Sequence, residues 1–126
     1  MLLHVLTCLL LWLHPSPRDV ARLQELEQIA VEVATTDAAD WEAELLAAIC
    51  IHETGCVAED RIFTHKDGLA RGPWQVRGEP SAREALRRVR WSWAACGDLS
   101  LYAGCGGCGR CPGIVRSLTD PTVPRL

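Results

Sequence analysis

The sequence predicts a small all-α domain, or at most an α-dominated α+β domain, from three observations. The chain has 126 residues, the length of a single domain with one core. Ala, Leu, Glu and Arg, which favour helices, dominate, and runs typical of strands are scarce. Hydrophobic residues make up 48% of the chain, as in a globular protein rather than a disordered one. The net charge of −3 does not indicate a nucleic-acid-binding protein.

The first segment, residues 2–13, is almost continuously apolar. It is too short to span a bilayer, which requires about 20 residues, and it is similar to the apolar region of a secretory signal. No Lys or Arg precedes it, and no small-residue cleavage motif follows it. We expect residues 1–16 to act as a signal for export to the periplasm, cell envelope or extracellular space, and residues 17–126 to form one domain. A buried amino-terminal helix or a misplaced start codon is the alternative.

Residues 14–17 contain two prolines and interrupt the chain. Ser16 suits the N-cap of a first long helix, with Pro17 at its first position, and the helix ends near Thr35. Apolar residues recur along it at helical spacing. They are Val20, Leu23, Leu26, Ala30 and Val33.

A second helix covers residues 41–54, is capped by Thr36 or Asp37, and ends at Gly55. Its apolar residues lie on more than one face, which is typical of a buried helix. Near its end the apolar stripe continues onto Glu53. A carboxylate at such a position is costly unless it is paired or protonated, so Glu53 is a candidate functional residue.

Residues 57–80 show no periodicity and contain several Gly and Pro, which predicts loops with at most a short hairpin. Ser81 and Glu84 form a capping-box pattern that opens a third helix, which ends at Gly97. Its inner stripe is expected at Leu86, Val89 and Trp93, and its arginines are expected on a solvated face. A short fourth helix at 98–102, a Gly/Cys loop at 104–113 and a turn at 114–118 follow.

Six cysteines remain once the first segment is removed, and an even number in an exported chain indicates disulfides. Fifteen pairings are possible, and the sequence does not choose among them. The spacing of Cys105, Cys108 and Cys111 is also typical of metal sites. An iron–sulfur set with Cys96 is one alternative, and a zinc ion held with help from His52, His65, Cys50 or Cys56 is another. We favour disulfides and expect no metal and no cofactor.

Three short fragments stand out together: His52-Glu53-Thr54-Gly55, Gly72-Pro73-Trp74-Gln75-Val76 and Leu101-Tyr102-Ala103-Gly104. Their order and spacing resemble those of the lysozyme-like lytic transglycosylases of the soluble type, over residues 41–118. The chain departs from that family in four ways. Thr54 stands where the family has Ser, Pro73-Trp74 replaces Leu-Met, and no Asn follows Tyr102. The distance of 49 residues from Glu53 to Tyr102 is also short for the family.

The resemblance implies a lysozyme-like helical fold with a loop-rich cleft, in a monomer without a stable membrane span. It implies cleavage of the β-1,4 bond between N-acetylmuramic acid and N-acetylglucosamine in peptidoglycan glycan strands, leaving 1,6-anhydro ends. Glu53 would be the catalytic acid and then base, aided by the acetamido group and C6 hydroxyl of the substrate. Thr54, Gln75, Trp74 and Tyr102 would bind the substrate. An apolar wall near Glu53 would favour its protonated form.

Solvation or packing in the core could also explain the same residues without a catalytic or binding role. A Glu near a helix end is usually solvated, and Trp74 is as well explained by a place in the core. Asp60 and Asp67 could supply the second carboxylate of a hydrolase, although solvation in a loop explains them better. The alternative function is a small metal- or disulfide-stapled domain that binds partners or sugars without catalysis.

Overall fold

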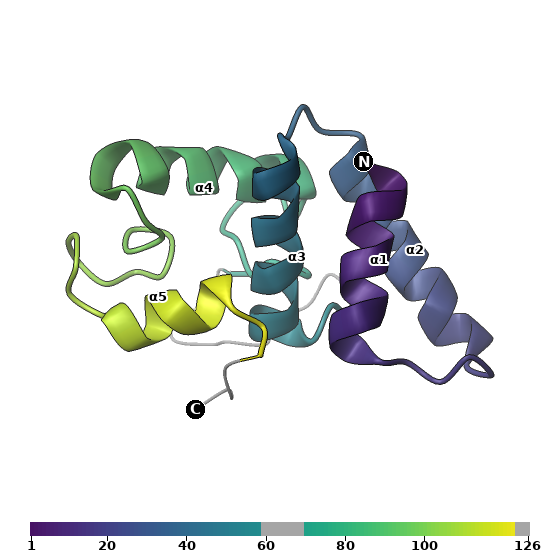
Figure 1. Cartoon of the computed structure of the whole chain (residues 1–126). Helices are drawn as coiled ribbons and strands as arrows, with labels where there is room; N and C mark the ends of the chain where they lie inside the picture. The colour runs from purple at the N-terminus through teal and green to yellow at the C-terminus, as the bar shows by residue number, and fades with distance from the viewer. Residues whose placement is uncertain (59–69, 123–126) are drawn as a thin grey trace.

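A computed structural model of the chain describes residues 1–58 and 70–122 (Figure 1). Within these ranges the structure contains five helices and no strand, which confirms the all-α prediction. They are α1 (Leu2–Leu13), α2 (Val20–Ala34), α3 (Asp40–Thr54), α4 (Ala82–Cys96) and α5 (Pro112–Thr119).

Helix α3 is the centre of the fold, because it contacts each of the other four helices. Figure 1 shows α1 and α2 on one side of α3, and α4 and α5 on the other. Residues on several faces of α3 are buried, including Ala43, Leu46 and Ile49, which confirms the prediction of a buried helix. Because α3 is packed on several faces, its carboxyl end and the residues there are held in one place.

Helix α1 packs against α2 and α3 and buries Val5 and Leu9 completely. The apolar segment at 2–13 therefore has a place in the core, as the alternative of a buried amino-terminal helix describes. In the part of the chain that the structure describes, no helix is long and apolar enough to cross a membrane. That residues 1–16 act as a signal for export stays a prediction.

The helix boundaries agree with the sequence where a capping residue acts locally. Gly55 and Gly97 end α3 and α4 with φ angles of 74° and 71°, which glycine adopts without strain. Ser81 caps α4, and its hydroxyl accepts a hydrogen bond from the backbone N–H of Glu84 at 3.1 Å. The expected cap of α2 at Ser16 is wrong, because the carboxylate of Asp19 accepts the N–H of Arg22 instead.

The region after α3 differs from the sequence prediction in three places. Residues 98–104 form turns instead of a short helix, and the expected turn at 114–118 is part of α5. On α4 the inner stripe includes Ser92, which is fully buried, whereas Trp93 is 37% exposed. Helical spacing from Ala85 and Val89 places position 92 on the buried face. The prediction chose Trp93 because it is hydrophobic, and it was wrong by one residue.

The arginines of α4 do not form a uniformly solvated face. Arg83 and Arg87 are exposed, but Arg90 joins α4 to α3 through a hydrogen bond of 2.8 Å from its Nε to Glu42. This guanidinium holds the pKa of the Glu42 carboxyl below its ordinary value. Glu42 also accepts the N–H of Ala39 at the start of α3, so it serves both as a cap and as an ion-pair partner.

Three disulfides confirm the predicted use of the cysteines. Cys50 and Cys56 join the end of α3 to the loop after it. Cys96–Cys108 and Cys105–Cys111 tie the Gly-rich loop to the end of α4 and to the start of α5. Cys8 is the remaining thiol. The loop after α3 and the Gly-rich loop before α5 are thus fixed covalently.

Alkylation without reductant should modify only Cys8 in a chain that keeps residues 1–16, and no cysteine in a chain that has lost them. Reductant should lower the melting temperature, because loss of one native bridge in a small domain costs about 2–5 kcal/mol. Mass spectrometry and thermal unfolding give the two measurements. Several free thiols together with stoichiometric zinc or iron would contradict the disulfide assignment.

Candidate functional site

A cleft of about 380 Å³ lies between the end of α3 and the helices α4 and α5. Its wall brings together Glu53 from α3, Gln75 from the turn before α4, and Tyr102 from the turns after α4. Each of these residues comes from one of the three fragments that stand out in the sequence. Gln75 and Tyr102 are 22 and 49 residues from Glu53 along the chain. Thr54 and Trp74 are not in the wall.

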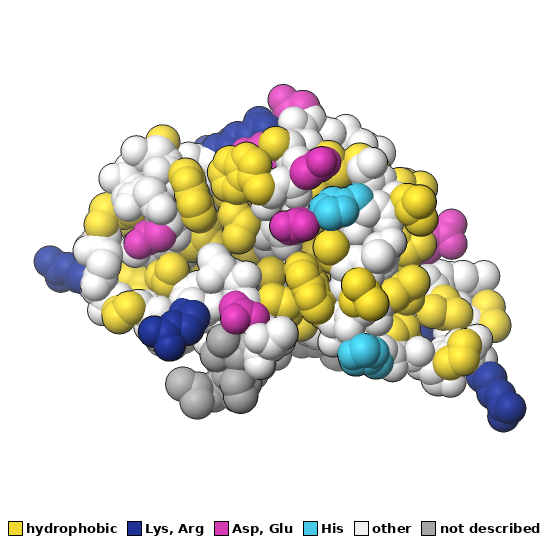
Figure 2. All heavy atoms as spheres, viewed as in Figure 1, with side chains coloured by type: hydrophobic (Ala, Val, Ile, Leu, Met, Phe, Trp, Pro, Cys, Tyr) yellow, Lys and Arg dark blue, Asp and Glu magenta, His cyan; other side chains and the backbone are white. Residues whose placement is uncertain are grey.

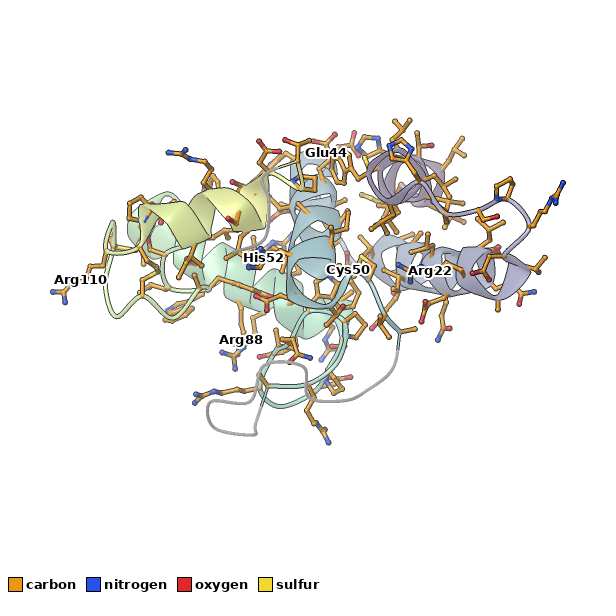
Figure 3. All side chains as sticks on the ribbon, turned by 90° about the horizontal axis from the view of Figure 1, so that it is seen from below. Arg22, Glu44, Cys50, His52, Arg88 and Arg110 are labelled. Atoms are coloured by element: carbon orange, nitrogen blue, oxygen red, sulfur yellow. A yellow bond between two sulfur atoms is a disulfide. The ribbon has the colours of Figure 1, made fainter. Side chains whose placement is uncertain are left out.

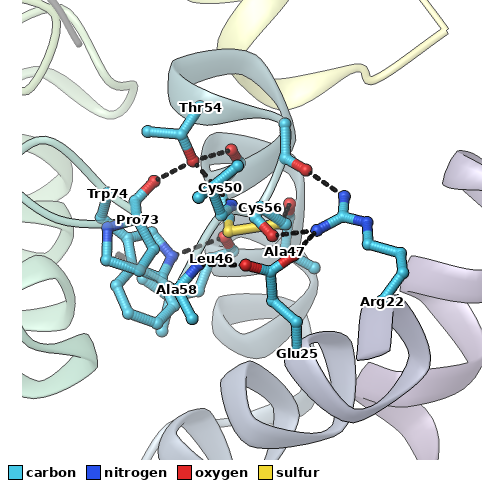
Figure 4. The surroundings of a disulfide bond; sticks show 12 residues. Arg22, Glu25, Leu46, Ala47, Cys50, Thr54, Cys56, Ala58, Pro73 and Trp74 are labelled. Atoms are coloured by element: carbon cyan, nitrogen blue, oxygen red, sulfur yellow. Dashed lines mark hydrogen bonds and ion pairs between the residues drawn. A yellow bond between two sulfur atoms is a disulfide. The ribbon is translucent and has the colours of Figure 1, made fainter. Parts of the chain in front are cut away.

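Glu53 lies in the last turn of α3 and is half-buried. Two connections fix this turn (Figure 4). The first is the Cys50–Cys56 disulfide, which closes the chain back onto the helix. The second is Arg22 of α2, whose guanidinium donates to the carbonyl oxygens of Gly55 and Cys56 and also pairs with Glu25. A cation at the carboxyl end of a helix also complements its dipole.

Thr54 is buried, and its side chain acts within the fold. Its hydroxyl lies 3.0 Å from the carbonyl oxygen of Pro73, to which it donates, and 3.3 Å from that of Cys50. The hydroxyl oxygen of Thr54 also accepts a hydrogen bond from the backbone N–H of Val57 at 3.2 Å. Thr54 thereby joins the helix that carries Glu53 to the turn that carries Gln75 (Figure 4). The expected contact of Thr54 with the substrate has no support in this placement.

The turn at residues 71–76 is closed by an antiparallel bridge between Arg71 and Val76. Gly72 has a φ of +79°, and a Cβ at this position would lie 2.6 Å from the Cβ of Pro80. Glycine is therefore required both for the backbone angle and for the approach of Pro80. Gln75 also has a positive φ of 46°, and its side-chain Nε2 donates to the carbonyl oxygen of Gly72 at 2.8 Å. The amide is thus held at the cleft by its own turn.

Trp74 points into the core instead of the cleft. It is fully buried, and its indole Nε1–H donates to the carbonyl oxygen of Leu46 at 2.8 Å. A substrate cannot reach this ring without unfolding the turn, so the expected sugar contact at Trp74 is not compatible with the structure. The indole instead anchors the turn on α3.

Tyr102 is held by its backbone as well as by its ring. The N–H groups of Leu101 and Tyr102 donate to the hydroxyl of Ser92, which itself donates to the carbonyl oxygen of Asp98 at 2.8 Å. The phenol hydroxyl donates to the carbonyl oxygen of Trp74 at 3.0 Å. Burial raises the pKa of the phenol well above its ordinary value, the nearby Glu53 carboxylate raises it further, and Arg88 opposes both. Tyr102 is therefore neutral beside Glu53.

The cleft also contains residues that the sequence analysis did not propose. Arg88 and Trp91 lie three residues apart on α4, and the Trp91 side chain is 51% exposed. Arg77 also lines the wall, and so does His52, which belongs to the first of the three fragments. Figure 3 shows His52 and Arg88 on the same side of α3. The spacing of three residues could have placed Arg88 and Trp91 on one face, but only the fold shows that this face borders Glu53.

Asp60, Asp67 and His65, considered above as a second carboxylate or a metal ligand, lie outside the described residues. Among the described residues of the wall, Glu53 is the only carboxylate. Comparison of the chain with family models, with curated proteins and with solved structures finds no match.

Replacing Thr54 with Val should lower the free energy of unfolding by about 1–3 kcal/mol, because the N–H of Val57 and the carbonyl of Pro73 lose their partner. Thr54→Ser keeps the hydroxyl and should stay close to the original chain. Urea unfolding monitored by circular dichroism measures both variants. If Thr54→Val were as stable as the original chain, the joining role of the hydroxyl would be refuted.

Proposed function

We propose that the chain is a lytic transglycosylase that cleaves peptidoglycan glycan strands at the β-1,4 bond between N-acetylmuramic acid and N-acetylglucosamine. The observation that carries the proposal is the meeting of Glu53, Gln75 and Tyr102 in one cleft. A proton donor acts only within about 2.6–3.2 Å of its target, so groups that orient the same sugar must gather around it. Three separated fragments with that arrangement support a glycan-cleaving site.

Glu53 is the proposed general acid and, in the second half of the reaction, the general base. It donates its proton to the glycosidic oxygen as the bond breaks, and it takes the proton of the C6 hydroxyl as the 1,6-anhydro ring closes. The acetamido group of the substrate supplies the assistance that a second carboxylate gives in most glycosidases. The absence of another carboxylate among the described wall residues agrees with this chemistry.

The wall around Glu53 combines apolar and basic side chains. Val76, Leu101, Ile114 and Leu118 contribute apolar surface, and Arg77 and Arg88 contribute positive charge. Apolar surface disfavours the charged form of a carboxylic acid, whereas nearby cations favour it. Tyr102 stays neutral and donates a hydrogen bond to the carbonyl oxygen of Trp74, so the phenol oxygen can accept a hydrogen bond from the sugar. The Gln75 amide supplies a further polar contact in the wall.

Trp91 is the aromatic side chain that we propose for the sugar face, in place of Trp74. Its ring is 51% exposed within the cleft, whereas that of Trp74 is fully buried. An aromatic ring offers a flat, rigid apolar surface that loses little conformational entropy when it binds a ligand. We therefore assign the sugar contact expected of Trp74 to Trp91 on α4.

Export of the protein belongs to the same proposal. Three disulfides persist in oxidising compartments, and peptidoglycan lies outside the cytoplasm. We propose that the protein acts as a monomer in the periplasm, the cell envelope or the extracellular space. The proposed reaction requires neither a cofactor nor a metal.

Glu53→Gln should reduce the clearing of purified peptidoglycan by about 10²–10⁴-fold, because the amide cannot donate the proton. Glu27→Gln, at an exposed position of α2, is the matched control and should keep the activity. Mass spectrometry of the products should find muropeptides one water lighter than hydrolysis products. Full activity of Glu53→Gln would remove the proposal, and binding without cleavage by the original chain would favour a sugar-binding domain.

Trp91→Ala should raise KM by about tenfold with little change in kcat, because the ring is proposed to bind substrate and transition state alike. Trp93→Ala is the matched control on the same helix: Trp93 packs against Trp41, with ring centroids 5.3 Å apart, and does not line the cleft. Steady-state kinetics with soluble glycan fragments distinguishes the two variants. Equal effects of both substitutions would show that the loss is a general one of α4 packing.

A further inference from the structure

A second group of chemically active side chains lies at the contact between α1 and α3, away from the cleft. His4 and Cys8 are one turn apart on α1 and so share a face, and Glu44 lies on α3. One potential ligand atom of each residue lies within 4.8 Å of the other two. On the face in Figure 2, a histidine side chain lies beside an acidic one where α1 meets α3, and Figure 3 labels Glu44.

The imidazole of His4 gives an independent sign that this group is incomplete. Its Nε2 is shielded from solvent and forms no hydrogen bond within the described part of the chain. Oε1 of Glu44 lies 3.1 Å from this nitrogen, within ion-pair distance. Buried polar atoms nearly always have a hydrogen-bond partner, so a ring nitrogen that lacks one and faces a carboxylate and a thiol marks a place where a cation can bind all three.

We propose that His4, Cys8 and Glu44 form a binding site for a divalent zinc ion that holds α1 on α3. Nitrogen, sulfur and oxygen donors of this kind are the common ligands of zinc. In tetrahedral coordination such atoms are roughly 3.3–3.8 Å apart, given zinc–ligand distances of about 2.0–2.3 Å. The His4–Glu44 pair is already closer than this range, and the remaining atoms need to move by only about 1 Å.

The charges at the site agree with a dication. A zinc ion neutralises a thiolate and a carboxylate together, with the imidazole neutral. Glu44 is half exposed, so water reaches the fourth coordination position.

Titration of the oxidised full chain with Co²⁺, after dialysis against a chelator, tests the proposal. One equivalent should bind, with a visible spectrum of tetrahedral cobalt and a near-ultraviolet thiolate-to-cobalt band. Cys8→Ser should lose that band, and His4→Gln and Glu44→Gln should each weaken binding by about 100-fold or more, since loss of a mere supporting partner already costs 10–100-fold. His14→Gln and Glu27→Gln, at exposed positions, are the controls.

Thermal unfolding keeps the test decisive if a variant is less stable. Zn²⁺ should raise the melting temperature of the original chain and leave that of Cys8→Ser unchanged, because only a ligand that binds the folded state stabilises it. Absence of the thiolate band, or equal Co²⁺ affinity in Cys8→Ser, would overturn the site. So would a mature protein, isolated from its own cells, that lacks residues 1–16. None of these outcomes bears on Glu53, because the variants leave the cleft intact.

Discussion

The hydroxyl of Thr54 holds the cleft together with the indole of Trp74, because both link the helix that carries Glu53 directly to the turn that carries Gln75. It donates to the carbonyl of Pro73 and accepts the N–H of Val57, so one oxygen atom serves three segments. The positive φ of Gln75, the approach of Gly72 to Pro80 and the burial of Trp74 all require the turn to stay where Thr54 holds it. The position of the amide opposite Glu53 follows from that bond.

The side of the cleft that carries Tyr102 is also held by a buried hydroxyl group. Ser92 is fully buried on α4, and its hydroxyl receives the N–H groups of Leu101 and Tyr102, which have no helix to satisfy them. The phenol of Tyr102 then reaches the carbonyl of Trp74, so the two halves meet at a backbone oxygen. A buried N–H or C=O must find a partner. In this chain short hydroxyl side chains provide the partners, and loops become rigid enough to form a binding wall.

The features that were predictable from the sequence are those set by neighbours along the chain. Gly55, Ser81 and Gly97 end or begin helices through local backbone geometry, and the apolar faces of α3 predict its burial. A place in the core was one of the two interpretations that the sequence left open for Trp74. The hydrogen-bond partners of Thr54 and Trp74 were not predictable, because they lie 19 and 28 residues away. Position along a fragment indicates that a residue is near the cleft. It does not indicate whether the side chain faces the cleft or the core, and that depends on which carbonyl needs a donor.

The spacing of Cys105, Cys108 and Cys111 has a consequence for how the chain reaches its native state. Cys108 pairs with Cys96, and the Cys105–Cys111 bridge spans the position of Cys108, so the two closed loops overlap. Thiols that are nearest along the chain meet most often in an unfolded chain, because closing a short loop costs the least entropy. Pairing between adjacent members of the triplet is therefore favoured early and is non-native. Thiol–disulfide exchange would convert such pairs into the native ones, and a catalyst of disulfide isomerisation would speed that conversion.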